Sequence, residues 1–141
     1  MKQNILVSAC LLGECCRYDG KSKPCEKVIA LAEKYEIIPV CPEVAGGLST
    51  PRAPSEMQKD GRFINSEGAD VTENYRKGAQ STLHTAIENG CKLAVLKEKS
   101  PSCGVHCRYD GSFTRTLIPE SGITASLLRE NGITVISEED I

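Results

Sequence analysis

The chain has 141 residues, which is the size of one ordinary domain. With 17 Lys and Arg against 19 Asp and Glu, its net charge is −2, and only 4% of the residues are aromatic. This composition argues against a nucleic-acid polymer as partner, because it offers neither a broad basic face nor a base-stacking platform. No apolar run approaches the roughly 20 residues that span a bilayer. The apolar stretch near the start is too short for a signal peptide, so we expect a cytoplasmic protein without a membrane partner.

Alternating strands and helices are predicted along the chain. Short apolar runs rich in Val, Ile and Leu predict buried strands at residues 4–9, 36–40, 92–97 and 132–137. Helical periodicity lies between them, at residues 24–35, 70–88 and 121–130. Two segments, 44–63 and 100–119, fit neither pattern and predict long loops of the kind that are functional or mobile. The order predicts an α/β fold: a mostly parallel sheet of about four strands covered by helices, in a Rossmann-like three-layer single domain over residues 1–141.

Cysteine is the unusual component, with 8 residues in 141. In a reducing compartment such cysteines more often bind metal or do chemistry than form disulfides. The plain alternative is a set of reduced thiols packed in the core. Cys10 and Cys41 come directly after the first and second predicted strands, and Cys103 follows the third by a few residues. Because sites in such sheets form at the carboxyl ends of strands, we expect these three thiols to meet at one edge.

The spacing of the cysteines favours an iron–sulfur cluster over zinc. No close Cys-x-x-Cys pair is present, and Cys103 with His106 and Cys107 is only a weak zinc half-site. Scattered thiolates suit the soft irons of a cluster. Three protein ligands on a 4Fe-4S cluster would leave one iron open, as a Lewis acid that holds a substrate atom such as sulfur.

Polar residues near these thiols are the candidates for catalysis and substrate binding. Glu43 would serve as general acid or base, and Ser100 or Ser102 would position substrate or relay a proton. Arg52, in a loop rich in Gly and Pro, is either a donor fork for a substrate carbonyl or anion, or a solvated loop arginine. Gly47 either lets the backbone approach a ligand or forms a plain turn.

The remaining cysteines and one histidine have plainer interpretations. Cys25 and Cys91 lie at a predicted helix start and strand start, where they fit as packing thiols. His84 lies within a predicted helix and is expected to be structural or on the surface. The adjacent Cys15 and Cys16 are open to two interpretations: they oxidise as a pair, or Cys16 supplies a fourth ligand.

Four motifs in order carry a resemblance to a known family. They are SACLLG at residues 8–13, RYDG at 17–20, CPE with GGL and PR across 41–52, and SPSCG at 100–104. Together they resemble a small bacterial domain, long classed as of unknown function, that includes the thiouracil desulfidases. The resemblance covers nearly the whole chain, and the combination is far more specific than any one motif.

The resemblance implies a cofactor, a reaction and the residues that serve them. It implies an α/β fold with a 4Fe-4S cluster that Cys10, Cys41 and Cys103 hold, and with it the cluster-assembly machinery as partner. The implied reaction converts a 2-thiouracil-like thiolated pyrimidine base to uracil without redox change. Its thiocarbonyl sulfur binds the open iron, water attacks the carbon, and the sulfur stays on the cluster as hydrosulfide. The catalytic carboxylate falls on Glu43, and the serine falls within SPSCG, on Ser100 in preference to Ser102.

The extra thiols support an alternative function. Cys15, Cys16 and Cys107 lie outside the family's ligand set, and Cys16 or Cys107 on the fourth iron would block the open position. The alternative is a non-catalytic iron–sulfur or zinc-binding protein that acts as a redox or metal sensor. A third possibility is a metal-free thiol domain that binds a small ligand and stays colourless. Because an exposed cluster is easily lost in air, zinc is expected as a substitute in protein purified aerobically.

Overall fold

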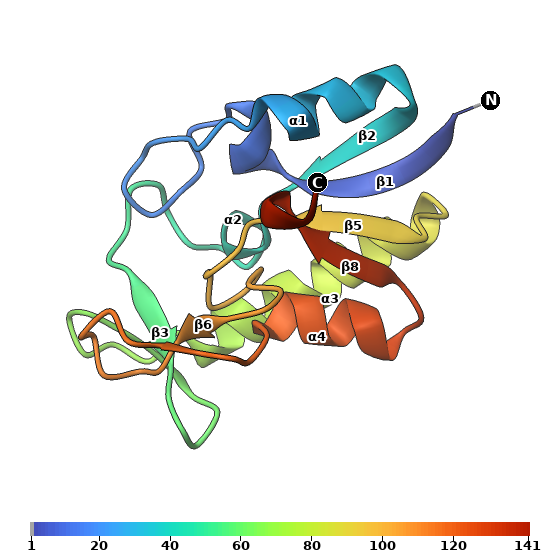
Figure 1. Ribbon diagram of the computed structural model, residues 1–141. Helices are drawn as coiled ribbons and strands as arrows, with labels where there is room; N and C mark the ends of the chain where they lie inside the picture. Colours follow the sequence, from blue (N-terminus) through green and yellow to red (C-terminus); the bar gives the residue numbers. More distant parts are fainter. Residues whose placement is uncertain (1) are drawn as a thin grey trace.

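Four parallel strands form the central sheet, in the order β2-β1-β5-β8 (Figure 1). They are β1 (Gln3–Ser8), β2 (Tyr35–Val40), β5 (Leu93–Leu96) and β8 (Thr134–Ser137). The structure is a computed structural model that describes residues 2–141. Each strand overlaps a predicted one, so the predicted parallel sheet is confirmed.

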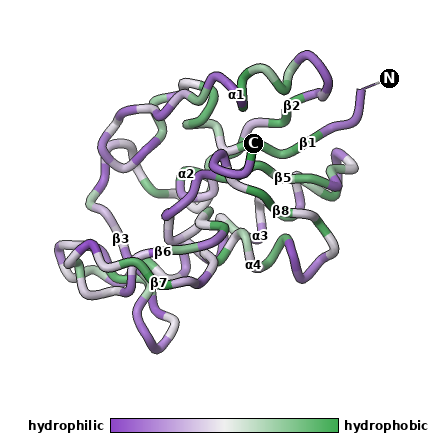
Figure 2. The backbone as a smooth tube through the Cα atoms, viewed as in Figure 1, coloured by the Kyte–Doolittle hydropathy of each residue, from purple (hydrophilic) through white to green (hydrophobic). Residues whose placement is uncertain are grey.

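Helices cover both faces of this sheet, as predicted. One face carries α3 (Thr72–Glu88) and α4 (Ile123–Glu130), and the other carries α1 (Glu26–Ile29) with the short 3₁₀ helices η1 (Ala9–Leu12) and η2 (Ala30–Glu33). Alternation along β1 supplies both cores: Leu6 faces α3 and α4, whereas Ile5 and Val7 face the α1 side. Apolar segments follow the strands in Figure 2, and polar segments follow the outer loops. The fold is therefore a three-layer, Rossmann-like α/β domain.

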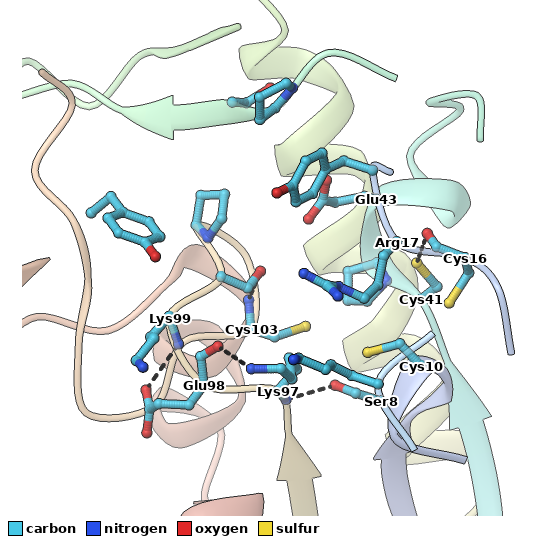
Figure 3. A pocket seen from close by; sticks show the side chains of 18 of the residues that line it. Ser8, Cys10, Cys16, Arg17, Cys41, Glu43, Lys97, Glu98, Lys99 and Cys103 are labelled. Carbon is cyan, nitrogen blue, oxygen red and sulfur yellow. Dashed lines mark hydrogen bonds between the residues drawn. The ribbon is translucent and has the colours of Figure 1, made fainter. Parts of the chain in front are cut away.

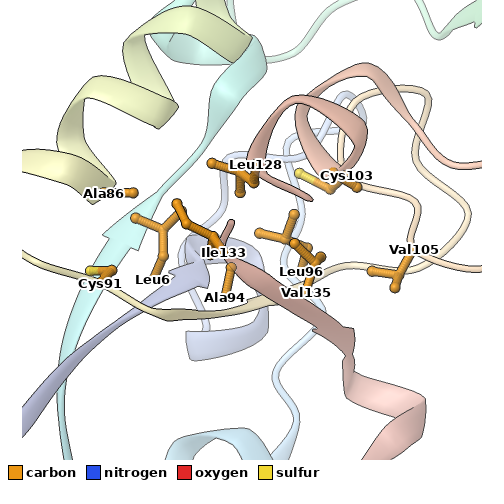
Figure 4. Packing of buried hydrophobic residues seen from close by; sticks show 11 residues of the cluster. Leu6, Ala86, Cys91, Ala94, Leu96, Cys103, Val105, Leu128, Ile133 and Val135 are labelled. Carbon is orange, nitrogen blue, oxygen red and sulfur yellow. The ribbon is translucent and has the colours of Figure 1, made fainter. Parts of the chain in front are cut away.

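Leu128 of α4 offers a direct test of the larger core. Its side chain is fully buried among residues of β5, β8 and α3 (Figure 4). We expect Leu128→Ala to lower the free energy of unfolding by roughly 2–5 kcal/mol, because it removes buried methyl groups and leaves a cavity. Urea denaturation measures this change. Ile87→Ala on α3 is the matched control, since Ile87 is 62% exposed and its truncation should cost less than about 0.5 kcal/mol.

Two small antiparallel hairpins lie beyond the carboxyl edge of the sheet. They are β3 (Ser55–Met57) with β4 (Phe63–Asn65), and β6 (Arg108–Tyr109) with β7 (Leu117–Ile118). Strands β3, β6 and β7 lie within the segments predicted as loops, 44–63 and 100–119, so that prediction is wrong for these three strands. Oε1 of the buried Glu56 joins the hairpins by accepting the backbone N–H of Gly111 at 2.9 Å and of Phe113 at 3.2 Å. Gly111 has a φ of +98°, and an added Cβ would lie 2.8 Å from the Met57 carbonyl oxygen, so this junction requires glycine.

A short helix that the sequence did not predict, α2 (Pro42–Ala45), packs closely on α3. Glycines make the approach possible. A Cβ on Gly46 would collide with the Asn74 carbonyl, and one on Gly78 would collide with the Pro42 carbonyl. This packing places Glu43 beside Tyr75, near the N-terminal end of α3. Among residues 2–141, none of the helices is both long and apolar enough to cross a bilayer.

Candidate functional site

A cavity of about 520 Å³ lies at the carboxyl edge of the sheet. Its wall combines the ends of β1, β2 and β5 with residues of both hairpins, so the loops and the sheet enclose one space. Ligand sites in open parallel sheets form at this edge.

Three thiols converge in this cavity. Cys10 lies in η1 directly after β1, Cys41 precedes α2 directly after β2, and Cys103 lies in the turn that follows β5. Cys10 and Cys103 are buried, with 8% and 5% of their surface exposed. Figure 3 shows the three sulfur atoms facing a common space, each carried by a different segment. The structure thus brings together the thiols that the strand-end argument predicts.

The surroundings of Cys41 lower its pKa, whereas those of the other two thiols raise theirs. A hydrogen bond from the Cys16 thiol and another from the Val44 backbone N–H lower the pKa of Cys41 to about 6. As a thiol, Cys41 instead donates to the Cys16 carbonyl oxygen at 3.7 Å. Burial raises the pKa of Cys10 to about 11, and burial also raises the pKa of Cys103. Any metal group that takes all three as thiolates must therefore displace protons from Cys10 and Cys103.

The thiols fit a multi-iron cluster better than a single ion. Within residues 2–141, no group of three or more His, Cys, Asp or Glu side chains is arranged around one ion position. A cluster needs a wider arrangement, because each thiolate binds a different iron. Three soft sulfur donors from separate elements, opening on one cavity, match that requirement.

Glu43 lies in the wall of the same cavity, and two neighbouring side chains hold its carboxylate in place. Its Oε1 accepts a hydrogen bond from Arg52 Nε at 3.1 Å and one from the Tyr75 hydroxyl at 2.9 Å. Burial and the neighbouring Glu43 charge raise the pKa of Tyr75, so its hydroxyl stays protonated and donates. Because both bonds use Oε1, Oε2 remains available to the cavity.

The two serines of the SPSCG motif have different environments. Ser100 lines the cavity, and its Oγ accepts the backbone N–H of Ser102 at 3.1 Å and of Cys103 at 3.0 Å. The hydroxyl hydrogen of Ser100 is therefore free to donate elsewhere. Ser102 is only 1% exposed and bonds Thr124 Oγ1 of α4 at 2.6 Å. Of the two candidates, the structure brings only Ser100 to the cavity wall.

Arg52 and Gly47, the predicted substrate contacts, are not among the residues of the cavity wall. The Arg52 side chain is only 7% exposed, and its donors are engaged within the protein. Beside the bond to Glu43, it donates to the Ser49 carbonyl oxygen at 3.0 Å and to the Cys16 carbonyl oxygen at 3.0 Å. Arg52 thus positions Glu43 and the Cys16 segment. Gly47, with a φ of +93°, forms the turn after α2, which matches the plainer of its two interpretations.

Four further residues considered in the sequence, Cys25, Cys91 and the two histidines, do not line the cavity. Cys25 and Cys91 pack in the two cores, as predicted. His84 is exposed and pairs with Glu88, which confirms a surface position. His106 pairs with Asp140 at 2.8 Å, so the weak zinc half-site near Cys103 is not assembled.

Three residues of the site were missed by sequence reasoning. Tyr75 lies in the predicted helix 70–88, where nothing marked it as a site residue, although a buried Tyr needs a partner for its hydroxyl. Lys97 lies in the cavity wall, where its charge favours the thiolate of Cys10, and it pairs with Glu138 at 3.0 Å. Glu98 is 2% exposed. The sequence signal for Lys97 and Glu98 was that two charged residues directly follow the apolar run that forms β5.

Glu98 organises the turn that contains Cys103. Its Oε1 accepts the backbone N–H of Val105 at 2.7 Å, of His106 at 2.8 Å and of Cys107 at 3.2 Å. Burial alone would raise the pKa of Glu98, but these donors hold it below its usual value. A buried carboxylate therefore fixes the loop that presents the third thiol.

Comparison with known proteins places the chain in a family. The family described as 2-thiouracil desulfurase matches residues 5–140. The uncharacterized protein YbbK of Bacillus subtilis (strain 168) is 41% identical over 146 residues, which cover 97% of this chain and 97% of that protein. Among solved structures, the 4Fe-4S-dependent thiouracil desulfidase TudS is similar with a TM-score of 0.93 and 43% identity, over 99% of this chain and 93% of that one. The chain, with its strand-end thiols beside Glu43, belongs to the 2-thiouracil desulfurase family.

Proposed function

We propose that this protein is an iron–sulfur-dependent desulfidase that converts a thiolated pyrimidine base, such as 2-thiouracil, to uracil and sulfide. The observation that carries this proposal is the convergence of three thiols with Glu43 and Ser100 in one cavity. Family membership and the similarity to a 4Fe-4S-dependent thiouracil desulfidase support it. A free base, rather than a nucleic-acid polymer, is the expected substrate of a cavity of about 520 Å³ in a protein of net charge −2.

The cluster is proposed to be held by Cys10, Cys41 and Cys103. When bound, a 4Fe-4S cluster with three protein thiolates supplies one open, Lewis-acidic iron to which a thiocarbonyl sulfur can bind. Zinc is expected as a substitute in protein purified in air. Its binding would require the sulfur atoms to move closer together, because they are not arranged around one ion.

The chain's own residues account for the acid–base chemistry. Glu43 takes a proton from the attacking water at Oε2, while Arg52 and Tyr75 hold Oε1 in place. Ser100 donates its free hydroxyl hydrogen to the ring of the base or relays a proton to it. Water supplies the oxygen that replaces sulfur on the carbon, and the sulfur leaves as sulfide. No electrons are transferred between the base and the protein.

Tyr75→Phe tests how much the hydrogen bond from the Tyr75 hydroxyl to Glu43 contributes to turnover. The change removes one hydrogen bond to a charged group and leaves the aromatic stack of Tyr75 on Phe63 possible. Such a bond contributes about 1.5–3 kcal/mol, so we expect a fall of about 10- to 100-fold in kcat. Iron content should stay unchanged. Steady-state assays of uracil formation measure the effect. An unchanged kcat would show that the Tyr75 hydroxyl does not contribute to catalysis.

Ser100→Ala and Ser102→Ala separate the two serines of the SPSCG motif. Ser100 lines the cavity and has a free hydroxyl hydrogen, so its loss should lower kcat by about 10²-fold or more with the fold intact. Ser102 bonds Thr124 instead, so its loss should lower thermal stability and leave kcat within a few-fold of wild type. Paired kinetics and thermal unfolding measure the difference. The reverse assignment of effects would contradict the proposed role of Ser100.

Anaerobic purification tests the proposed function as a whole. We expect about four irons and four sulfides per chain, with the broad visible absorption of thiolate-bound iron. The same sample should form uracil from 2-thiouracil without added reductant. A loaded cluster with no turnover would favour the sensor function, and absence of iron after anaerobic reconstitution would rule out the cluster.

A further inference from the structure

Cys16 is a fourth thiol in the wall of the cavity, and the proposed reaction does not use it. The carbonyl oxygen of Cys16 accepts a hydrogen bond from Cys41 Sγ at 3.7 Å, which places the two residues side by side. Figure 3 shows the Cys16 and Cys41 side chains next to each other at one border of the group of sulfurs. Two thiols in contact can form a disulfide without a large backbone movement.

Cys16 lies behind Cys41 and not among the three central thiols. A second cavity of about 430 Å³ is lined by Cys16 and Cys41, but Cys10 and Cys103 are not part of its wall. The pair therefore separates the substrate cavity from a second opening. Cys41 therefore faces this second opening as well as the first cavity.

The backbone fixes Cys16 in this position. Arg52, whose guanidinium also holds Glu43, donates to the Cys16 carbonyl oxygen at 3.0 Å. The segment that carries Cys16 is thus tied to a buried ion pair. The neighbouring Cys15 is exposed instead, and the buried Cys10 and Cys103 do not contact Cys16 through a hydrogen bond. Cys41 is therefore the partner that the geometry gives to Cys16.

We propose that Cys16 is a resolving thiol for Cys41, and that the two form a reversible disulfide when the site is oxidised. This inference rests on the proposed function only for the role of Cys41 as a cluster ligand. Peroxide oxidises the Cys41 thiolate to a sulfenic acid and leaves as hydroxide. The Cys16 thiol then attacks that sulfur, the S–S bond forms, and water departs with the sulfenic oxygen. Two thiols supply the two electrons that peroxide accepts, and a dithiol reductant returns them.

A disulfide at this position would protect the site from irreversible damage. Without a resolving partner, a sulfenic acid is oxidised further to a sulfinic acid, which a thiol reductant cannot reverse. With Cys16 beside it, Cys41 would be stored in a form that reduction restores to a ligand. The same bond would prevent a cluster from binding until reduction occurs.

Peroxide treatment of the anaerobically purified full chain, followed by blocking of free thiols and peptide mapping, tests the proposal. We expect a dominant Cys16–Cys41 linked peptide, and dithiothreitol with iron and sulfide should then restore the iron content. In Cys16→Ser, the linked peptide should be absent, Cys41 should carry sulfinic acid, and iron binding should stay lost. Cys15→Ser is the matched control and should behave like wild type.

Different outcomes separate this inference from the proposed function. A linked Cys15–Cys16 or Cys10–Cys41 peptide, or full recovery of iron by oxidised Cys16→Ser, would overturn the resolving role. Because the thiol mapping needs no turnover, an active enzyme without the Cys16–Cys41 bond refutes only this inference. A protein that forms the Cys16–Cys41 disulfide but does not desulfurate 2-thiouracil refutes the proposed function and supports the resolving role of Cys16.

Discussion

Replacing Cys41 with alanine is expected to abolish iron binding and uracil formation together. Cys41 is the thiol whose surroundings most favour the thiolate, since the Cys16 thiol and the Val44 N–H donate to its sulfur. Removing it leaves two thiol donors in the group, both buried and both with a raised pKa. Iron should fall from about four per chain to near zero after anaerobic reconstitution. Iron analysis and the visible spectrum measure the loss.

Cys15→Ala is the matched control for this experiment. Cys15 is exposed and neighbours the site in sequence, yet it does not line either cavity that Cys41 lines. It should keep full iron content and turnover. Retention of a complete cluster by Cys41→Ala would show that other residues hold it, with Cys16 the first candidate because of its contact with Cys41.

Glu43→Gln is expected to separate cluster binding from catalysis. Glutamine keeps the shape of the side chain and can still accept hydrogen bonds from Arg52 and Tyr75. It cannot take a proton from water, and loss of a general base lowers turnover by about 10²–10⁴-fold. Iron content should remain at the wild-type level. Because the proton moves only in the reaction step, kcat should fall while KM changes little.

A suitable control for Glu43→Gln is Glu33→Gln, an exposed position in η2 that lies outside both cavities. It makes the same chemical change far from the thiols and should leave kinetics unchanged. Undiminished activity of Glu43→Gln would exclude Glu43 as the base. Loss of iron from the same variant would instead assign Glu43 to the structure of the site.

The central sheet and the meeting of the thiols could be predicted because both depend on local pattern. Alternating strands and helices determine a parallel sheet, and that topology alone carries Cys10, Cys41 and Cys103 to one edge. No long-range contact had to be known. The same argument placed Glu43 near the thiols, because it follows Cys41 by two residues.

The remaining features depend on partners that are distant in sequence. Strands β3 and β6 have three and two residues, too few for a pattern, and Glu56 joins their hairpins across 55 residues to Gly111. Ser100 and Ser102 could not be told apart in the sequence, because the distinction comes from Thr124 on α4. Arg52 likewise looks like an exposed loop residue until Glu43 and the Cys16 carbonyl oxygen are placed around it.

The dependence of turnover on cluster loading tests the central claim most directly. Samples of one anaerobic preparation, reconstituted to different iron contents, would be assayed for uracil formed from 2-thiouracil. The account predicts a rate proportional to the loaded fraction, with no activity at zero iron and one sulfide released per uracil. A rate independent of iron, or a fully loaded protein that forms no uracil, would contradict it.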